Sequence, residues 1–177
     1  MRALLSMMFA GGIALTSGLG WSCVATAADQ GTAGNPVETA RQAEKGSLTS
    51  PYTDVAKVAE EGHQKYMAAG CNGCHGGTGG GGMGPPLTNP IWVYGSDDDT
   101  LFRLIALGTD ELQKQGYSRK GSENVVGPMP EMGTVVKAND DLWKIIAWIK
   151  SVNQSGSGST STQTAPIGGP GAAAKPQ

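Results

Sequence analysis

The feature that most constrains this chain is the sequence Cys-Asn-Gly-Cys-His at residues 71–75. Two cysteines separated by two residues and followed at once by histidine have the spacing at which c-type haem is attached. Their thiols can add to the two vinyl groups on one edge of the porphyrin, and the adjacent imidazole is then placed under the iron. The motif therefore predicts one covalently bound haem, attached at Cys71 and Cys74 and ligated by His75.

Two other kinds of site also use a Cys-x-x-Cys pair. A zinc site needs a second pair of ligands, and the only other histidine is His63. A redox-active pair normally opens a helix after a strand, whereas a glycine-rich loop follows here at residues 76–84. We therefore favour haem attachment, and we interpret His63 as a solvent-facing helix residue rather than as a haem ligand.

Length and charge limit the remaining possibilities. A chain of 177 residues allows one domain with additional segments at both ends. Its formal net charge of −2 excludes the basic surface that nucleic-acid binding requires. Only 6% of the residues are aromatic, so a haem would supply apolar volume that the side chains lack. The third cysteine, Cys23, lies far from the motif, and no disulfide framework is indicated.

Residues 1–27 have the features of a secretory signal peptide. Arg2 supplies a positive charge, residues 3–18 form the apolar stretch, and Ala-Thr-Ala at 25–27 matches a cleavage site. An uncleaved membrane anchor is the alternative, but this stretch is short and interrupted by glycine and serine. We expect export to the periplasm, with no membrane span after cleavage. Export agrees with the haem motif, because bacteria attach haem outside the cytoplasmic membrane.

The remaining chain divides into three segments. Residues 28–50 lack periodic apolar positions and are expected to form a flexible lead-in. The domain itself is expected over residues 51–153. Residues 154–177, rich in glycine, serine, alanine and proline, are expected to form a disordered tail.

Helical periodicity predicts the first and last helices of the domain. Thr53 is expected to cap a helix over residues 54–69, in which Gly62 permits close approach of a second helix. Asn139 or Asp140 is expected to cap another helix, which ends near Val152. Its apolar positions are Leu142, Ile145, Ile146, Ile149 and Val152. We predict that Trp148 of this helix meets Tyr66 and Gly62 of the first.

Residues 96–108 have the pattern of a shorter helix. Ser96 and Asp99 form a capping-box start, and the helix is expected to stop at Gly108. The polar residues 109–127 are expected to form a surface loop that contributes to a docking face.

Two segments between the helices carry further candidate site residues. A backbone carbonyl in the Gly-Pro-Pro-Leu segment at 84–87 is well suited to accept the Nδ1–H of His75. Trp92 and Tyr94 follow in an extended segment. Each of them can either hydrogen-bond a haem propionate or cover the core, and the sequence does not decide between these roles.

Methionines downstream are candidates for the sixth iron ligand. A thioether stays bound in both oxidation states of the iron and raises the reduction potential. Met129 lies between two prolines on a stiff loop and is the first candidate. Met132 is the alternative, and Met83 is a distant third.

Taken in order, these features resemble the class I c-type cytochromes over residues 52–153. The resemblance rests on the first helix, the Cys-x-x-Cys-His motif, Gly-Pro-x-Leu, Met-Pro-x-apolar-Gly and the last helix. It implies an all-α fold of three or more helices around one haem c. It also implies that the Pro85 carbonyl is the partner of His75 and that Met129 is the distal ligand. The family often has an aromatic residue where this chain has Met132. Because of this difference, Met132 remains an alternative to Met129 as the distal ligand.

Within that family, the segments at 84–87, 91–96, 127–132 and 143–150 look like those of small cytochromes from methylotrophs and related bacteria. Some of those proteins accept electrons from quinoprotein (PQQ) alcohol dehydrogenases. The resemblance implies an electron carrier. The sequence also shows no nucleophile–base pair or carboxylate dyad, so we do not expect the chain itself to be an enzyme. Its donor would be a dehydrogenase or membrane complex, and its acceptor an oxidase or another cytochrome.

Docking between such partners is expected to be weak, brief and sensitive to salt. Two alternatives remain open at this stage. One is a haem enzyme or gas-binding protein whose sixth position is open, and the other is a cytochrome subunit of a larger redox enzyme.

Overall fold

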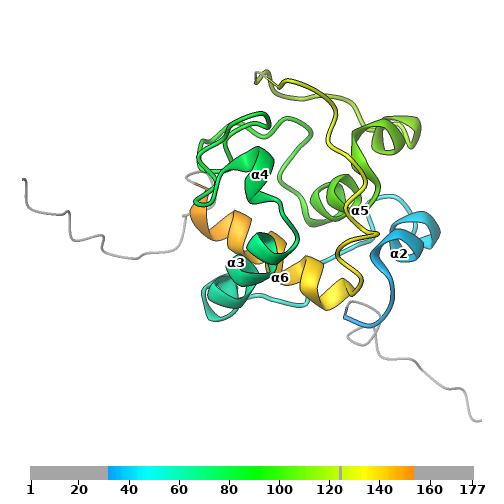
Figure 1. Ribbon diagram of the computed structural model, residues 1–177. Helices are drawn as coiled ribbons and strands as arrows, with labels where there is room; N and C mark the ends of the chain where they lie inside the picture. Colours follow the sequence, from blue (N-terminus) through cyan, green and yellow to red (C-terminus); the bar gives the residue numbers. More distant parts are fainter. Residues whose placement is uncertain (1–31, 124, 154–177) are drawn as a thin grey trace, which may run out of the picture.

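The computed structural model describes residues 32–123 and 125–153, and every regular element in this part of the chain is helical (Figure 1). In order, the elements are α2 (Pro36–Gln42), the 3₁₀ turn η1 (Val55–Lys57), α3 (Ala59–Ala68), α4 (Asn72–His75), α5 (Asp98–Lys114) and α6 (Asn139–Val152). The predicted all-α fold is confirmed. The expected signal peptide and C-terminal tail lie outside the described residues. Of the helices described, none is both long and apolar enough to span a bilayer.

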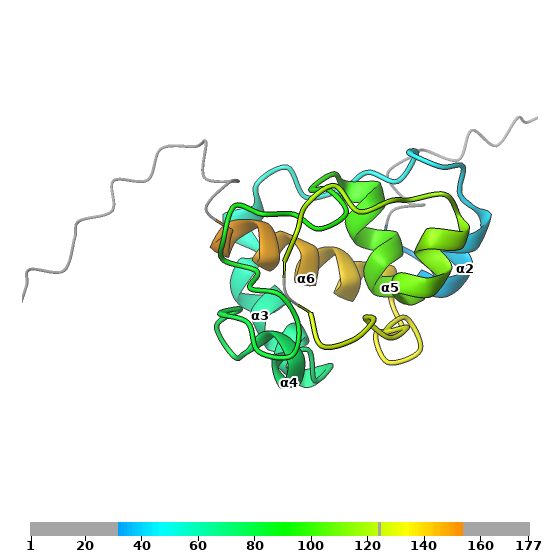
Figure 2. The same cartoon turned by 90° about the horizontal axis from the view of Figure 1, so that it is seen from above.

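Helices α3 and α6 cross in close contact at Gly62. A Cβ atom built on Gly62 would lie only 2.0 Å from the carbonyl oxygen of Lys144, so a larger residue does not fit. One turn further on, the rings of Tyr66 and Trp148 have centroids 4.3 Å apart. The predicted contact between these two helices is confirmed. Figure 2 shows α6 running from α3 at one end towards α5 and α2 at the other.

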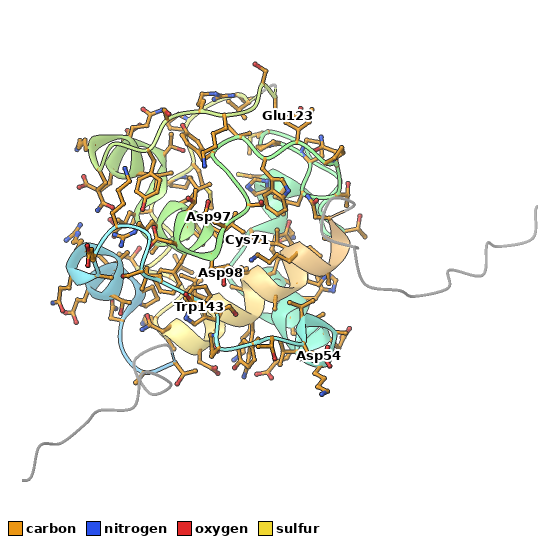
Figure 3. The ribbon with its side chains drawn as sticks, turned by 180° about the vertical axis from the view of Figure 1, so that it is seen from behind. Asp54, Cys71, Asp97, Asp98, Glu123 and Trp143 are labelled. Carbon is orange, nitrogen blue, oxygen red and sulfur yellow. The ribbon has the colours of Figure 1, made fainter. Side chains whose placement is uncertain are left out.

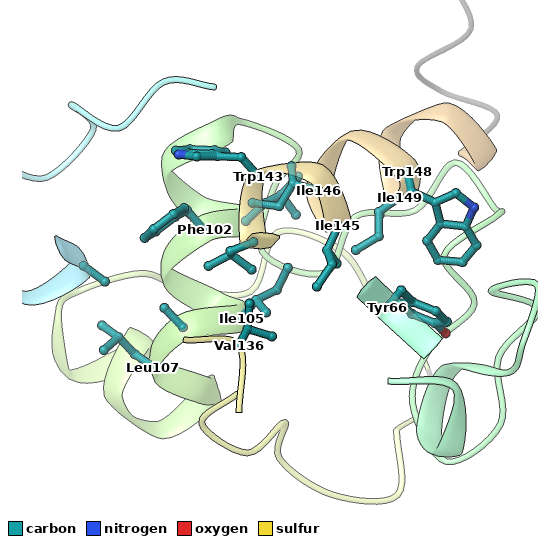
Figure 4. Close-up of a cluster of buried hydrophobic side chains, with 14 residues drawn as sticks. Tyr66, Phe102, Ile105, Leu107, Val136, Trp143, Ile145, Ile146, Trp148 and Ile149 are labelled. Carbon is teal, nitrogen blue, oxygen red and sulfur yellow. The ribbon is translucent and has the colours of Figure 1, made fainter. Parts of the chain in front are cut away.

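The core forms along the apolar face of α6. Leu142, Ile145 and Ile146 are at most 1% exposed, as their helical spacing predicts. At the other end of the core, the rings of Phe102 and Trp143 have centroids 4.6 Å apart. Figure 4 shows the two ends of this core, with the Phe102–Trp143 pair at one end and Tyr66 with Trp148 at the other.

Several predicted helix starts are wrong. Helix α3 begins at Ala59 rather than at residue 54, because residues 55–57 form a 3₁₀ turn, and Val58 rather than Thr53 is its N-cap residue. Helix α5 is capped by Asp97, whose side chain accepts from the Thr100 N–H at 2.9 Å, rather than by Ser96. Helix α6 begins at Asn139, and its N-cap residue is Ala138, without a side-chain bond, rather than Asn139 or Asp140.

The prediction of a surface loop from residue 109 is also wrong for its first part. Gly108 does interrupt the helix, with φ of 77°, but the helix resumes and ends at Lys114. Leu112 explains this continuation, because its side chain is completely buried. A single apolar residue among polar neighbours gives little periodic signal, although it anchors a full helical turn.

The expectation of a flexible lead-in before Pro51 is wrong for residues 32–50. The side chain of Asn35 caps α2, and Ala40 within it is completely buried. Arg103 of α5 donates to the carbonyl oxygens of Ala43 and Glu44 at 3.0 and 2.8 Å. A helix this short is stabilised by tertiary contacts rather than by its own periodicity. Figure 1 shows α2 on the outer side of α5.

Candidate haem site

The Cys-x-x-Cys-His motif forms one helical turn, α4, directly after α3. The N–H of Cys71 donates to the carbonyl oxygen of Tyr66 at 3.2 Å, and the N–H of His75 donates to that of Cys71 at 3.0 Å. This turn brings both thiols and the imidazole to the same cavity. Figure 3 shows Cys71 in the interior of the molecule, whereas Asp54 and Glu123 lie at its periphery.

The chemistry of Cys71 does not fit a redox-active pair. Cys71 and Cys74 do not form a disulfide with each other. Burial raises the pKa of the Cys71 thiol to about 11, so this sulfur is protonated at neutral pH. Catalytic and redox cysteines instead have lowered pKa values that favour the thiolate.

A zinc site is not formed either. Nowhere in the described chain do three or more histidine, cysteine, aspartate or glutamate side chains gather in a way that could hold a metal ion. The remaining use of the motif, attachment of a cofactor through both sulfurs, is the one that agrees with the structure.

His75 is oriented by the loop that follows it. Its Nδ1 lies 2.9 Å from the carbonyl oxygen of Pro85, which can only accept, so Nδ1 carries the proton. The predicted hydrogen bond is therefore present. It leaves Nε2 as the nitrogen with a free lone pair, which is the arrangement that metal-ligating histidines use.

Gly84 lies against the face of the same ring. A Cβ atom built on it would be 2.7 Å from Cε1 and 2.9 Å from Nδ1 of His75. The N–H of Gly84 also donates to the carbonyl oxygen of Cys74 at 3.0 Å. The sequence predicts this loop but not the contact, for which the glycine before Pro85 is the only signal.

The cavity has a volume of about 680 Å³, within the range of roughly 300–1,000 Å³ that is usual for cofactor and ligand sites. Apolar side chains from the core helices line much of it, among them Leu101, Leu104, Ile105, Ile145 and Ile149. The haem-attachment motif, Pro85, Trp92, Tyr94 and the three candidate methionines line it as well. The cavity thus brings together every predicted site residue.

Trp92 and Tyr94 contribute polar atoms to this cavity. Nε1 of Trp92 is buried without a hydrogen-bond partner. Tyr94 is 4% exposed, and its hydroxyl accepts from Nε2 of Gln113 at 2.8 Å while keeping its own proton to donate. A buried N–H without a partner is costly. An acidic group of a bound porphyrin would satisfy it, so the cavity fits haem in polarity as well as in volume.

Residues 128–133, here called the methionine loop, carry Met129 and Met132. Both methionines are half-buried and line the cavity, whereas Met83 is 55% exposed at its mouth. Thr109 holds the first part of the loop, since its N–H donates to the Met129 carbonyl at 2.9 Å and its hydroxyl accepts from the Met129 N–H at 3.0 Å. This role of Thr109 has no sequence signal.

Gly108 makes room for the same part of the loop. A Cβ atom built on Gly108 would lie 2.8 Å from the carbonyl oxygen of Met129. The interruption of α5 at Gly108 therefore lies where the methionine loop approaches the helix. From the sequence, Gly108 is predicted only to end the helix, and its contact with the methionine loop is not predictable.

His63 does not line the cavity, and it is not solvent-facing as expected. Its ring is half-buried and stacks on Trp148, with centroids 4.6 Å apart. Its Nε2 lies 2.7 Å from the carbonyl oxygen of Gly77, and the Tyr66 hydroxyl donates to that of Gly76 at 2.6 Å. Both side chains thereby hold the chain just after His75.

An all-α fold that gathers a Cys-x-x-Cys-His motif and a methionine loop around one apolar cavity defines a c-type cytochrome. The family model described as Cytochrome c matches residues 59–153, more than half of the chain. The chain belongs to the cytochrome c family, and the predicted class I c-type cytochrome with covalently bound haem c is confirmed.

The chain is also similar to a solved structure, that of cytochrome CL from the marine methylotrophic bacterium Methylophaga aminisulfidivorans MPT. The two share 26% sequence identity with a TM-score of 0.41, and the match covers 57% of this chain and 56% of that one. The chain thus spans little more than half of that protein's length. No curated protein matches the chain.

Proposed function

We propose that this protein is a periplasmic monohaem cytochrome c that carries single electrons between redox proteins. The observation that supports the proposal most strongly is the shared cavity, which the His75 imidazole and the methionine loop both line. The protein can therefore supply both axial ligands and leave no coordination site for a substrate. Haem supplies the chemistry when bound, since its iron alternates between two oxidation states.

The side chains around the cavity have distinct roles in this proposal. Cys71 and Cys74 hold the haem through thioether bonds, and His75, oriented by Pro85, is the proximal ligand. Met129 is the distal ligand, with Met132 as the alternative. The apolar lining excludes water and limits reorganisation, while Trp92 and Tyr94 donate to the acidic groups of the haem.

Exposed apolar side chains surround the mouth of the cavity. Met83, Ile91, Val125 and Val126 are between 37% and 80% exposed and line the cavity as well. We call them the apolar collar. The Val126 N–H donates to the carbonyl oxygen of Met83 at 3.0 Å, which joins two of the loops that carry it. We propose the collar as the face through which donor and acceptor approach the haem.

The donor in this proposal is a dehydrogenase or membrane complex, and a quinoprotein alcohol dehydrogenase is the specific candidate. That candidate rests on the sequence segments that resemble methylotroph cytochromes. The acceptor is an oxidase or another cytochrome, and the periplasmic location rests on the signal-like residues 1–27.

The visible spectrum of the ferrous, haem-loaded protein before and after addition of carbon monoxide tests the proposal. We expect no change, because a methionine already occupies the sixth position. Met129→Ala is expected to bind carbon monoxide, and Met132→Ala is the matched variant that retains the ligand. A prompt change in the wild-type spectrum would favour a haem enzyme or gas-binding protein. A stable complex with a larger redox enzyme on gentle purification would favour a subunit instead.

A further inference from the structure

Helix α2 lies outside residues 59–153, which the family model matches, yet it contacts the methionine loop. A Cβ atom built on Gly133, at the end of this loop, would lie 2.6 Å from Cγ2 of Val37 in α2. The same atom would lie 2.7 Å from the carbonyl oxygen of Ala106 in α5. Gly133 is thus held tightly between the two helices. Arg41 of α2 adds an exposed ion pair, with its Nη2 3.7 Å from Oε2 of Glu131.

Helix α2 is itself anchored at both ends. Before and within the helix, Asn139 of α6 donates its N–H to the carbonyl oxygen of Gly34 at 3.1 Å and its Nδ2 to Oγ1 of Thr39 at 2.9 Å. At the end of the helix, the guanidinium group of Arg103 in α5 donates to three backbone carbonyl oxygens, that of Ala40 within α2 and those of Ala43 and Glu44 just after it. The helix is therefore a fixed support rather than a loosely attached extension.

The methionine loop is held unevenly along its length. Met129 has two hydrogen bonds to Thr109. At the other end, the N–H groups of Met132 and Gly133 donate to the carbonyl oxygens of Ile105 and Ala106 at 3.0 and 3.1 Å. These two bonds are covered from outside by α2, because Val37 packs directly over Gly133.

We infer that α2 is a positioning element for the sixth iron ligand and that Val37 is its contact residue. Val37 presses the end of the methionine loop against α5 and thereby slows the opening that would release the ligand. Local opening is governed by the contacts that a segment loses when it separates from its support. The inference rests on the proposed electron carrier, but it does not depend on whether Met129 or Met132 is the ligand.

The test compares Val37→Ala with Val58→Ala in the full-length, haem-loaded protein. Both substitutions remove the same two methyl groups from a half-buried valine, but Val58 is the N-cap residue of α3 and is not among the nearest neighbours of Gly133. In Val37→Ala we expect the Met132 and Gly133 amides to exchange hydrogen about tenfold faster, the factor that corresponds to two buried methyl groups. Carbon monoxide should bind the ferrous protein faster by the same factor.

The controls separate this role from general destabilisation. Val58→Ala should change neither rate beyond its effect on global unfolding, and Arg41→Ala should have little effect, because an exposed pair contributes little. Gly133→Ala, whose new methyl group collides with Val37, should loosen the loop in the same direction. Equal rates in Val37→Ala and Val58→Ala would overturn the inference. Prompt carbon monoxide binding by the wild-type protein would instead overturn the proposed function and, with it, the inference.

Discussion

The imidazole of His75 lies flat against the backbone of Gly84, with only 2.7 Å between its Cε1 and the position that a Cβ atom on Gly84 would take. The same ring donates through Nδ1 to Pro85. Two consecutive residues therefore fix the ring, one by its face and one by its edge. In the proposed carrier, an imidazole fixed in this way would need no reorientation when the charge on the iron changes.

Replacing Gly84 by alanine is expected to displace the His75 ring, because the new methyl group cannot fit beside it. Overpacking of this kind costs about 1–3 kcal/mol in the free energy of unfolding. We expect a shifted visible spectrum and faster carbon monoxide binding in the ferrous protein. Gly80→Ala is the matched control in the same loop, where the closest atom to the new methyl group would be Thr78 Oγ1 at 3.9 Å. Identical spectra for the two variants would contradict this explanation.

Trp92→Phe removes the buried indole N–H that we expect to donate to a haem carboxylate. Without this hydrogen bond, the negative charge of the carboxylate is less neutralised and favours the ferric state of the iron. The midpoint potential should therefore fall by about 20–60 mV, which corresponds to the free energy of one hydrogen bond in a one-electron couple. Potentiometric titration measures this shift. Trp143→Phe, which changes a core residue outside the cavity lining, should lower stability and leave the potential unchanged.

The ion pair between Asp99 and Arg103 makes stability depend on pH at the acid end. Burial raises the pKa of Asp99, but hydrogen bonds from Arg103 and Tyr117 outweigh it and hold this pKa below its usual range. A carboxylate with a lowered folded-state pKa stabilises the protein above its unfolded pKa of about 3.9, and this contribution is lost as the pH falls through the folded value.

We therefore expect the free energy of unfolding to decrease between about pH 5 and pH 2, and Asp99→Asn to show a flatter profile in that range. At pH 7 the variant should lose about 3 kcal/mol, since Arg103 remains buried without its counterion. Denaturant titrations followed by circular dichroism would measure both effects. Asp54→Asn, at an exposed ion pair with Lys57, is the control and should change little.

Gly62→Ala should separate α3 from α6. Its methyl group would lie 2.0 Å from the Lys144 carbonyl, which is backbone and cannot rotate away. We expect a loss of about 3 kcal/mol or more in the free energy of unfolding. Gly127→Ala, where no atom lies within 4 Å of the new methyl group, should unfold like the wild type.

Electron exchange with a partner should slow as salt is added. Asp110 and Arg119 line the same cavity as the apolar collar, and charged groups beside a docking face steer weak encounters mainly at low ionic strength. Stopped-flow mixing with a purified quinoprotein alcohol dehydrogenase would give the rate constant as a function of salt. A rate that does not change with ionic strength would indicate that the collar alone determines docking.

Much of the fold was predictable because strong local patterns agree with tertiary contacts. The apolar spacing in α6 predicted its buried face, and Gly62 predicted the close helix crossing. The bond between His75 and a carbonyl of the proline segment was also predictable, since the motif and the prolines restrict a short loop. These features depend on residues that are near in sequence or periodic.

Features that depend on distant partners were missed. Helix α2 has no apolar period of its own, and it is held by Arg103, more than fifty residues away, which donates to the carbonyl oxygen of Ala40 within the helix and to those of Ala43 and Glu44 just after it. Leu112 extends α5 because its side chain is buried, and Thr109 holds Met129 across a bend at Gly108. His63 was expected to face solvent because nothing near it in sequence reveals that it stacks on Trp148.

Arg103 also determines how short a segment of this chain can be used as a haem-binding domain in a fusion protein. Its guanidinium group is almost wholly enclosed and donates to backbone oxygens that precede residue 51. Anyone who fuses the haem-binding unit to another enzyme by cutting at residue 51 or 59 would leave an enclosed cation with several of its donors unused. A cut ahead of residue 32 keeps these acceptors, so the transferable unit is longer than the residues 59–153 that the family model matches.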